Sequence, residues 1–239
     1  MDGTAEKEAN WLTQGISHHQ PRPLILRAGA ECLHISPTFR DVLVSDRSIP
    51  WLTESSPTAW DSYASGGGPD YLVADCGSPE SHERRLRALL RLPVEDGHDL
   101  LEFGCGTGRL ADFVPRGVRY EGLDWSREVI ALAQRRRPHN AFRCGSVADL
   151  TPHDWVVASG PFNYAMGWSK SQTAEAVSAM WEASRRGIAL TALGIPAEGR
   201  LHYSGDELVS FLAPCDWSCL ELDRSYLPND VCLRAWRTR

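Results

Sequence analysis

The sequence contains no long hydrophobic run and no recognisable leader. Among its 239 residues, no apolar stretch approaches the ~20 residues that a membrane-spanning helix requires. Residues 1–10 are polar and acidic, whereas a secretory leader has a basic start and an apolar centre. We therefore expect a cytoplasmic protein with no membrane partner.

The cysteines lack any paired spacing. There are seven of them, an odd number, and no two form a Cys-x-x-Cys motif. We therefore expect reduced, buried thiols and no disulfide framework. A zinc site built from His202 and the three C-terminal cysteines is an alternative, but their spacing matches no common zinc site. Those cysteines are Cys215, Cys219 and Cys232, and we predict no metal.

An excess of positive charge is also missing. The formal net charge is −6, whereas nucleic-acid-binding proteins usually carry a basic patch. The arginine-rich residues 81–92 have apolar positions at helical spacing, and Glu83 lies among the arginines. This pattern predicts an amphipathic helix with a solvated charged face. We expect no nucleic-acid partner.

Three alternating glycines follow an apolar run in the stretch LLEFGCGTGRL at residues 100–110. Gly104, Gly106 and Gly108 can adopt positive φ and bring backbone N–H groups close to a ligand. A helix expected to begin near Thr107 directs its positive dipole end there. This strand, turn and helix predict a site for a nucleoside-bearing cofactor. The nicotinamide pattern needs a glycine where Arg109 stands, which argues against NAD. A turn that serves packing alone is the alternative.

Glu102 ends the strand before this turn, where an open α/β sheet presents ligand-binding groups. A carboxylate there repels a pyrophosphate and favours a ligand with ammonium or sulfonium charge. The motif EFGCGTG resembles motif I of the class I S-adenosylmethionine-dependent methyltransferases. The resemblance implies that Glu102, Cys105 and the three glycines hold the methionine end of S-adenosylmethionine.

A second acidic residue, Asp124, ends the next predicted strand at residues 118–124. In Rossmann-like sites an acid at this point accepts hydrogen bonds from ribose hydroxyls. The sequence Gly-Leu-Asp-Trp-Ser around Asp124 resembles motif II of the same family. The resemblance implies that Asp124 holds the ribose and that Trp125 lies against the adenine.

The third predicted strand, residues 141–145, is followed by Ser146 and Val147. The family more often has an aspartate after the glycine, which accepts from the adenine amino group. Ser146 can accept a hydrogen bond but adds no charge, and Asp149 substitutes only if the loop bends back. The resemblance implies that Ser146 and Val147 contact the adenine.

The predicted fourth strand, residues 153–160, leads into the loop Pro-Phe-Asn-Tyr at 161–164. This loop resembles motif IV, which lies beside the transferable methyl group. Gly160 replaces the first proline of the Ser-Pro-Pro-Phe form found in amino-group methyltransferases, so that chemistry is not carried over. The resemblance implies that Ser159 contacts the cofactor and that Asn163 and Tyr164 face the acceptor. A strand-capping role for Asn163 is the alternative.

Aromatic residues also precede motif I. The sequence Ala-Trp-Asp-Ser-Tyr at 59–63 resembles the segment that small-molecule methyltransferases fold over the cofactor, and aromatic faces suit a sulfonium. The resemblance implies a lid that contains Trp60 and Tyr63, whereas ordinary packing is the alternative. A general base is needed only if the acceptor must lose a proton. The candidate bases are Tyr63, Tyr164, His34 and His202.

The whole pattern predicts an α/β, Rossmann-like, doubly wound sheet of seven strands with an N-terminal extension. The sheet is mostly parallel, but residues 219–226 and 231–236 are joined by a link too short for a helix, so they form an antiparallel hairpin. Small strands within residues 24–44 are expected outside the main sheet. We expect residues 1–80 to form an arm and lid, and residues 81–239 to form the methyltransferase domain.

The resemblance implies a methyltransferase that transfers the methyl group of S-adenosylmethionine to an oxygen or nitrogen of a small molecule, in bacterial specialised metabolism. We expect a monomer or homodimer. One alternative is a protein that binds the cofactor without catalysis and regulates a partner, because a fold does not prove chemistry. Another is methylation of RNA or protein, which the negative charge and the lack of a recognition module disfavour.

Overall fold

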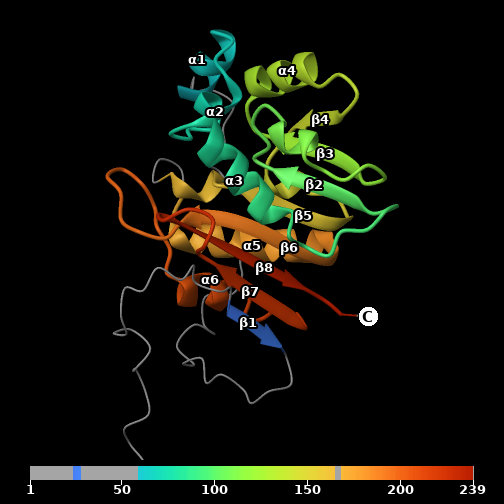
Figure 1. The fold of residues 1–239 in the computed structure, drawn as a ribbon, viewed down its shortest axis with the longest axis vertical. Helices are drawn as coiled ribbons and strands as arrows, with labels where there is room; N and C mark the ends of the chain where they lie inside the picture. The colour runs from blue at the N-terminus through green and yellow to red at the C-terminus, as the bar shows by residue number, and fades with distance from the viewer. Residues whose placement is uncertain (1–23, 28–58, 165–167, 239) are drawn as a thin grey trace, which may run out of the picture.

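The computed structural model describes residues 24–27, 59–164 and 168–238, and its centre is one sheet of eight strands (Figure 1). The strand order is β1-β7-β8-β6-β5-β2-β3-β4. The strands are β1 (Leu24–Arg27), β2 (Asp99–Phe103), β3 (Arg119–Asp124), β4 (Ala141–Cys144), β5 (His153–Ser159), β6 (Ser184–Leu193), β7 (Cys219–Asp223) and β8 (Asp230–Trp236).

Strands β2 to β8 have the predicted arrangement. Strand β2 lies between β3 and β5, and β2 to β6 all run parallel. Strand β8 is antiparallel to both β6 and β7, so the two C-terminal strands form the expected hairpin. The prediction of a mostly parallel, Rossmann-like seven-stranded sheet is confirmed.

Strand β1 corrects the expectation that the strands of residues 24–44 lie outside the main sheet. It pairs antiparallel with β7, with Leu24 opposite Leu222 and Arg27 opposite Cys219. This pairing covers backbone groups of β7 that would otherwise form an open sheet edge. A run of four residues does not reveal its pairing partner, so the sequence could not place it. The other strands expected there lie outside the described residues.

Helices cover both faces of the sheet (Figure 1). On one face, Leu101 and Val156 pack in a core with Met180 of α5 and Leu208 of α6. On the other face, Leu100 packs with Leu86 and other residues of α3. The helices are α1 (Ala59–Ser65), α2 (Asp70–Val73), α3 (Pro79–Leu89), α4 (Arg127–Arg136), α5 (Lys170–Ala183) and α6 (Gly205–Phe211). Among the described residues, no helix is both long and apolar enough to cross a membrane.

The helix expected from Thr107 is a single 3₁₀ turn, Arg109–Asp112. Its N-terminal flank is Gly108 in the left-handed region, and Pro115 follows shortly after it. Such a short turn has no aligned set of peptide dipoles comparable to that of a full helix. The expectation that a helix dipole faces the glycine turn is therefore wrong, and the turn's own N–H groups remain as the donors.

A buried arginine ties the C-terminal hairpin to α3. Arg234 of β8 is 1% exposed and lies 3.0 Å from Glu221 and 3.4 Å from Asp223, both on β7. Its Nη1 also donates to the carbonyl oxygen of Ala88, near the end of α3, at 2.7 Å. Because Asp223 is fully buried, this pair compensates a charge that water cannot reach.

We predict that Arg234→Met lowers the free energy of unfolding by about 3–5 kcal/mol, because it leaves the buried Asp223 without one of its cationic partners. Urea unfolding followed by circular dichroism measures the change. Arg87→Met is the control, since Arg87 and Glu83 form an exposed pair expected to contribute less than ~1 kcal/mol. Equal losses in the two variants would contradict this role for Arg234.

Candidate functional site

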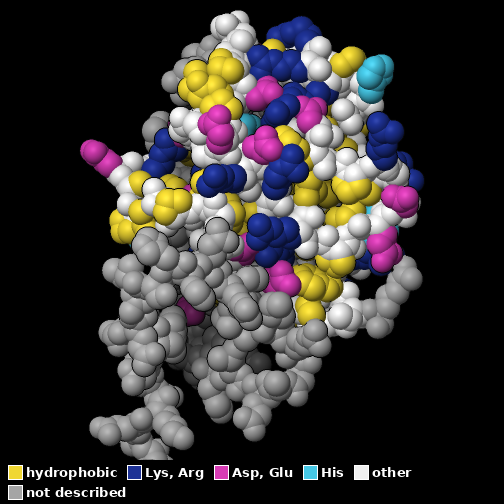
Figure 2. Space-filling view, viewed as in Figure 1, with side chains coloured by type: hydrophobic (Ala, Val, Ile, Leu, Met, Phe, Trp, Pro, Cys, Tyr) yellow, Lys and Arg dark blue, Asp and Glu magenta, His cyan; other side chains and the backbone are white. Residues whose placement is uncertain are grey.

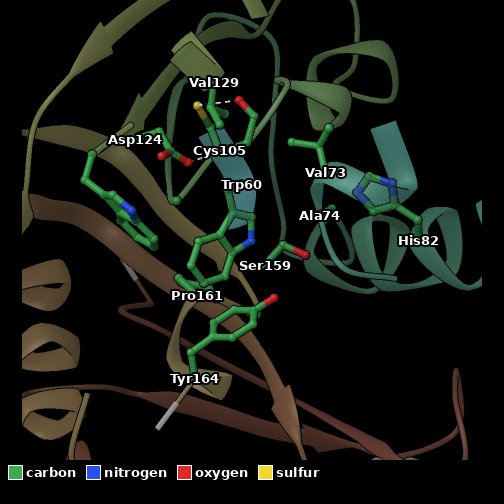
Figure 3. A pocket seen from close by; sticks show the side chains of 14 residues that line it. Trp60, Val73, Ala74, His82, Cys105, Asp124, Val129, Ser159, Pro161 and Tyr164 are labelled. Carbon is green, nitrogen blue, oxygen red and sulfur yellow. Dashed lines mark hydrogen bonds between the residues drawn. The ribbon is translucent and has the colours of Figure 1, made fainter. Parts of the chain in front are cut away.

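A cavity lies at the carboxyl ends of β2, β3 and β5, next to a cover segment that we define as residues 59–73, containing α1 and α2. About 50 Å³ of it is accessible to a water-sized molecule, and the cavity is partly open to solvent. Figure 3 shows side chains from these elements meeting around it. The lining residues are Trp60, Val73, Ala74, His82, Gly104, Cys105, Gly106, Asp124, Trp125, Val129, Ser159, Gly160, Pro161 and Tyr164.

The three glycines after β2 all adopt positive φ, but they have different surroundings. Their φ angles are 68° at Gly104, 53° at Gly106 and 73° at Gly108. A Cβ on Gly104 would lie 2.9 Å from Pro161, and a Cβ on Gly108 would lie 2.3 Å from the ring of Phe142. A Cβ on Gly106 would meet no described atom within 4 Å. Gly104 and Gly108 therefore allow close packing, whereas Gly106 opens onto the cavity.

Asp124 joins the glycine turn to the start of α4. Its side chain is 6% exposed and accepts from the N–H of Gly106 at 2.9 Å and from the N–H of Ser126 at 3.0 Å. Burial raises the pKa of Asp124 to about 6, although these hydrogen bonds favour the ionised form. At neutral pH Asp124 is therefore a carboxylate, and each oxygen has acceptor capacity left for a ligand.

Glu102 lies among buried residues of β2 and does not contribute to the cavity lining. Its side chain is 2% exposed and accepts a hydrogen bond from the hydroxyl of Tyr120 on β3 at 2.6 Å. Burial is the main cause that raises the pKa of Glu102 to about 8, and the charge of Asp124 adds to it. The protonated form therefore prevails at neutral pH, and a contact between Glu102 and a ligand ammonium remains a prediction.

Aromatic rings form one wall of the cavity. Trp60 of α1 makes edge-to-face contacts with Trp125, at 6.2 Å between ring centroids, and with Tyr164, at 4.5 Å. Figure 3 shows Trp60 and Tyr164 side by side at the cavity. The other predicted aromatic residue, Tyr63, also lies on α1, but its side chain is outside the described part of the structure.

Tyr164 is held by charged residues from two other segments. Its hydroxyl donates to Asp75 at 3.2 Å, Arg200 forms an ion pair with Asp75, and the Arg200 guanidinium lies 4.5 Å above the Tyr164 ring. Burial raises the pKa of Tyr164 to about 12, so its phenol stays protonated at neutral pH. Asp75 is the one non-glycine residue with positive φ in the described ranges. We call this group the Tyr164–Asp75–Arg200 cluster.

Several predicted residues lie away from the cavity lining. Asn163 is 6% exposed, and its Oδ1 accepts from the N–H of Leu193 at the end of β6 at 2.9 Å, as a cap would. Ser146 donates its N–H to Asp149 at 2.7 Å. Val147, Ser146 and the half-buried His202 do not line the cavity, and His34 lies outside the described residues. Their functional roles remain predictions.

His82, which lines the cavity from α3, is not among the site residues predicted from sequence patterns. His82 is 5% exposed, and burial is the main cause that lowers its pKa to about 4. A signal was available, because His82, Leu86 and Leu89 have the spacing of one buried helical face. A histidine on a buried, otherwise apolar helix face is unusual and indicates a candidate site residue.

No protein-family model and no curated protein matches the sequence. Solved structures do match the fold at low identity. Magnesium protoporphyrin IX methyltransferase (ChlM) from Synechocystis PCC 6803, with S-adenosylmethionine bound, has a TM-score of 0.53 and 16% identity over 66% of this chain and 80% of its own. The complex of DhpI with S-adenosylhomocysteine has a TM-score of 0.55 and 20% identity over 75% of this chain and 94% of its own. This chain has the class I S-adenosylmethionine-dependent methyltransferase fold.

The class I methyltransferase fold also occurs in a protein with another named activity. The [4+2]-cyclase SpnF matches with a TM-score of 0.50 and 18% identity, over 66% of this chain and 80% of its own. The fold therefore does not determine the reaction, which depends on the residues of the site.

The contrast between two glycines of this methyltransferase fold predicts different losses of stability. Alanine at either Gly106 or Gly108 has to adopt the left-handed region, at about 1–2 kcal/mol. We expect Gly108→Ala to lose a further ~1–3 kcal/mol, because its methyl group displaces the Phe142 ring. Thermal and urea unfolding measure both variants. Equal stabilities would mean that Phe142 moves aside freely.

Glu102 generates a prediction on pH. Its pKa rises from 4.5 to about 8 on folding, so its burial destabilises the protein progressively as pH increases through that interval. Glu102→Gln removes this penalty, and the variant should gain stability relative to wild type by at most ~1.4 kcal/mol per pH unit from pH 5 to 8. Urea unfolding at several pH values measures the difference. The exposed Glu128→Gln is the control and should show no trend.

Proposed function

We propose that this chain binds S-adenosylmethionine in the cavity and transfers its methyl group to an oxygen or nitrogen of a small molecule. One observation carries the proposal: the glycine turn opens onto the cavity at Gly106, beside an ionised acceptor on Asp124. The matched structures of ChlM and DhpI contain S-adenosylmethionine and S-adenosylhomocysteine, which supports the same ligand class here.

Asp124 is the residue that we assign to the ribose. Its two backbone hydrogen bonds fix the carboxylate, and its remaining lone pairs can accept from two adjacent hydroxyls. The space above Gly106 lets the ligand pass close to the backbone. Trp125, half-buried in the wall, is the candidate for the adenine face. We assign Ser159, Cys105 and Gly104 to the part of the ligand beyond the ribose.

When bound, S-adenosylmethionine supplies a methyl group that its sulfonium already makes electrophilic. The chain then has to align the acceptor and exclude water. Trp60 and Tyr164 present aromatic rings, whose faces attract positive charge. The thiol of Cys105 is buried, and burial raises its pKa well above its usual value, so it stays protonated. We assign no covalent step to it.

We propose that the acceptor lies on the side of the aromatic wall. Tyr164 donates a hydrogen bond to the acceptor or positions it. Its phenol is protonated at neutral pH and therefore does not act as a base. Asn163 acts through the loop that it braces against β6. Tyr63 and His202 stay as candidates for the acceptor side. In this proposal residues 1–80 form an arm and a lid, apart from β1, which pairs with β7, and residues 81–239 form the domain that carries the cofactor site.

Two rival functions remain in view. A cofactor-binding protein without methyl transfer is the first, and the match to the [4+2]-cyclase SpnF shows that the fold is not confined to one named activity. Methylation of RNA or protein is the second. On the face seen in Figure 2, basic and acidic side chains are interspersed, which disfavours a polyanionic acceptor. Cytoplasmic location and a monomeric or dimeric state remain predictions.

We predict that S-adenosylhomocysteine binds with micromolar-range affinity and that NAD does not bind. Asp124→Ala should weaken that affinity by about 10- to 100-fold, because charge-assisted hydrogen bonds contribute roughly 1.5–3 kcal/mol. Isothermal titration calorimetry measures both. Glu128→Ala removes an exposed carboxylate from the first turn of α4 and should leave the affinity unchanged.

Product formation distinguishes the rivals. A metabolite extract incubated with the protein and isotopically labelled S-adenosylmethionine should yield a small molecule carrying the labelled methyl group, detected by mass spectrometry. Tight cofactor binding without any labelled product would favour the non-catalytic protein. Binding of NAD with no heat from S-adenosylhomocysteine would overturn the proposed cofactor.

A further inference from the structure

The loop after β5 places hydrogen-bond donors beside the cavity. Gly160 lines the cavity, and a Cβ there would lie 3.1 Å from Nδ2 of Asn163 and 3.6 Å from Nη1 of Arg85. Apart from the chain neighbours of Gly160, no other described atom lies within 4 Å of that point. A ligand group that reaches this side of Gly160 therefore meets two nitrogens that carry hydrogens.

The amide of Asn163 faces this space with its nitrogen. Its Oδ1 accepts the N–H of Leu193 at 2.9 Å, and because an amide nitrogen cannot accept, this contact fixes the orientation of the amide. Its backbone carbonyl oxygen accepts the N–H of Leu201 at 2.9 Å. Nδ2 has no hydrogen-bond partner among the described residues, and it is not sealed from solvent as the unpaired hydroxyl of Thr191 is. Asn163 therefore offers a free donor, while its oxygens are engaged elsewhere.

Arg85 of α3 brings further donors to the same space. Its side chain is 12% exposed, its Nε donates to Asp230 at 2.7 Å, and its Nη1 donates to the sulfur of Cys76 at 3.1 Å. A thiol is a weak acceptor, so Nη1 stays available to a stronger one. Asp230 already balances the charge of Arg85, and the guanidinium therefore contributes N–H groups rather than net positive charge.

The described cavity lining contains no effective base for an acceptor that has to lose a proton. Tyr164 is a protonated phenol, and burial lowers the pKa of His82 to about 4, so its imidazole binds a proton weakly. The thiol of Cys105 is protonated. The carboxylate of Asp124 is held by two N–H groups and is assigned to the ribose. An acceptor that arrives as an anion needs no base.

We propose that the acceptor is a carboxylic acid, methylated on a carboxylate oxygen, and that Asn163 Nδ2 and Arg85 hold this carboxylate beside Gly160. This inference rests on the proposed function and narrows its acceptor atom to the oxygen of an acid. A carboxylic acid is ionised at neutral pH and offers only lone pairs, which matches a site that presents donors. An amine is protonated at neutral pH, needs a base, and would direct its own hydrogens at those donors.

The proposed transfer balances without a proton step. One carboxylate oxygen forms a bond to the methyl carbon while the carbon–sulfur bond breaks, and the electron pair of the broken bond remains on sulfur. The products are a methyl ester and S-adenosylhomocysteine. The negative carboxylate and the positive sulfonium are both neutralised, so the charge of the acceptor is balanced by the cofactor and not by an arginine.

Alkali distinguishes this product from its alternatives. A metabolite extract is incubated with the protein and S-adenosylmethionine labelled in its methyl group, and the labelled products are then treated with dilute alkali. A methyl ester releases labelled methanol, whereas methyl ethers and N-methyl groups are stable. We expect labelled methanol from the wild-type reaction, and label that stays on the products would overturn the inference.

Asn163→Asp tests the donor with one atom exchanged. The variant retains an oxygen for the N–H of Leu193 but replaces Nδ2 by a second carboxylate oxygen. We expect the yield of labelled methanol to fall by at least about tenfold, the effect of one charge-assisted hydrogen bond. The affinity for S-adenosylhomocysteine, measured by isothermal titration calorimetry, should stay unchanged, and thermal unfolding establishes that the variant is folded. If Asn163 only braces β6, the yield stays unchanged as well.

Two glycine variants test the space itself. Gly160 and Gly199 both have left-handed backbone, with φ of 73° and 66°, so alanine strains both. A methyl group at Gly199 meets no described atom within 4 Å, whereas one at Gly160 lies against Nδ2 of Asn163. Gly160→Ala should lower the yield by about tenfold or more, because a displaced carboxylate is misaligned with the methyl group. Gly199→Ala should retain the wild-type yield, and equal yields in the two variants would contradict this position of the carboxylate.

The outcomes separate this inference from the proposed function. Labelled products that resist alkali leave methyl transfer in place and exclude the carboxylic acid. If the protein binds S-adenosylhomocysteine but transfers no label, methyl transfer fails and the carboxylic acid acceptor fails with it. If it does not bind S-adenosylhomocysteine, the proposed cofactor itself is wrong.

Discussion

The carboxylate of Asp124 is the constraint on which the site depends. It receives the N–H of Gly106 from the turn after β2 and the N–H of Ser126 from the start of α4, so one side chain fixes two segments that are adjacent only in space. Ser126 in turn caps α4 and donates its hydroxyl to Asp61 in the cover segment. The position of α1 above the cavity is thus linked, through two side chains, to the end of β3.

Local patterns in the sequence were sufficient to predict most of the fold. Apolar runs bounded by turns predicted β2 to β8, and the short link at residues 227–230 predicted the hairpin. The failures have two causes. Strand β1 depends on the open edge of β7, a partner that the neighbouring sequence does not reveal. The helix expected after the glycine turn is shortened locally, between Gly108 in the left-handed region and Pro115.

The residues of the candidate site also differ in how well the sequence predicts their positions. Residues tied to a strand end, such as Asp124, Gly106 and Ser159, line the cavity because parallel strands bring their carboxyl ends together, and their roles in binding stay predictions. Residues tied to loops were less predictable: Asn163 braces β6, and Ser146 pairs with Asp149. His82 was missed because its site is created by α3 packing beside two strands that follow it in the chain.

The two sides of the cover segment are held by contacts of different strength. Asp70 pairs with Arg136 and with the 9% exposed Arg137, and Arg136 also binds the carbonyl oxygens of Gly67 and Gly68. The opposite side is closed by Asp75 and Arg200, which are 42% and 31% exposed, and exposed pairs contribute less than ~1 kcal/mol. Separating the turn after α2 from the loop before α6 should therefore cost less than separating α2 from α4.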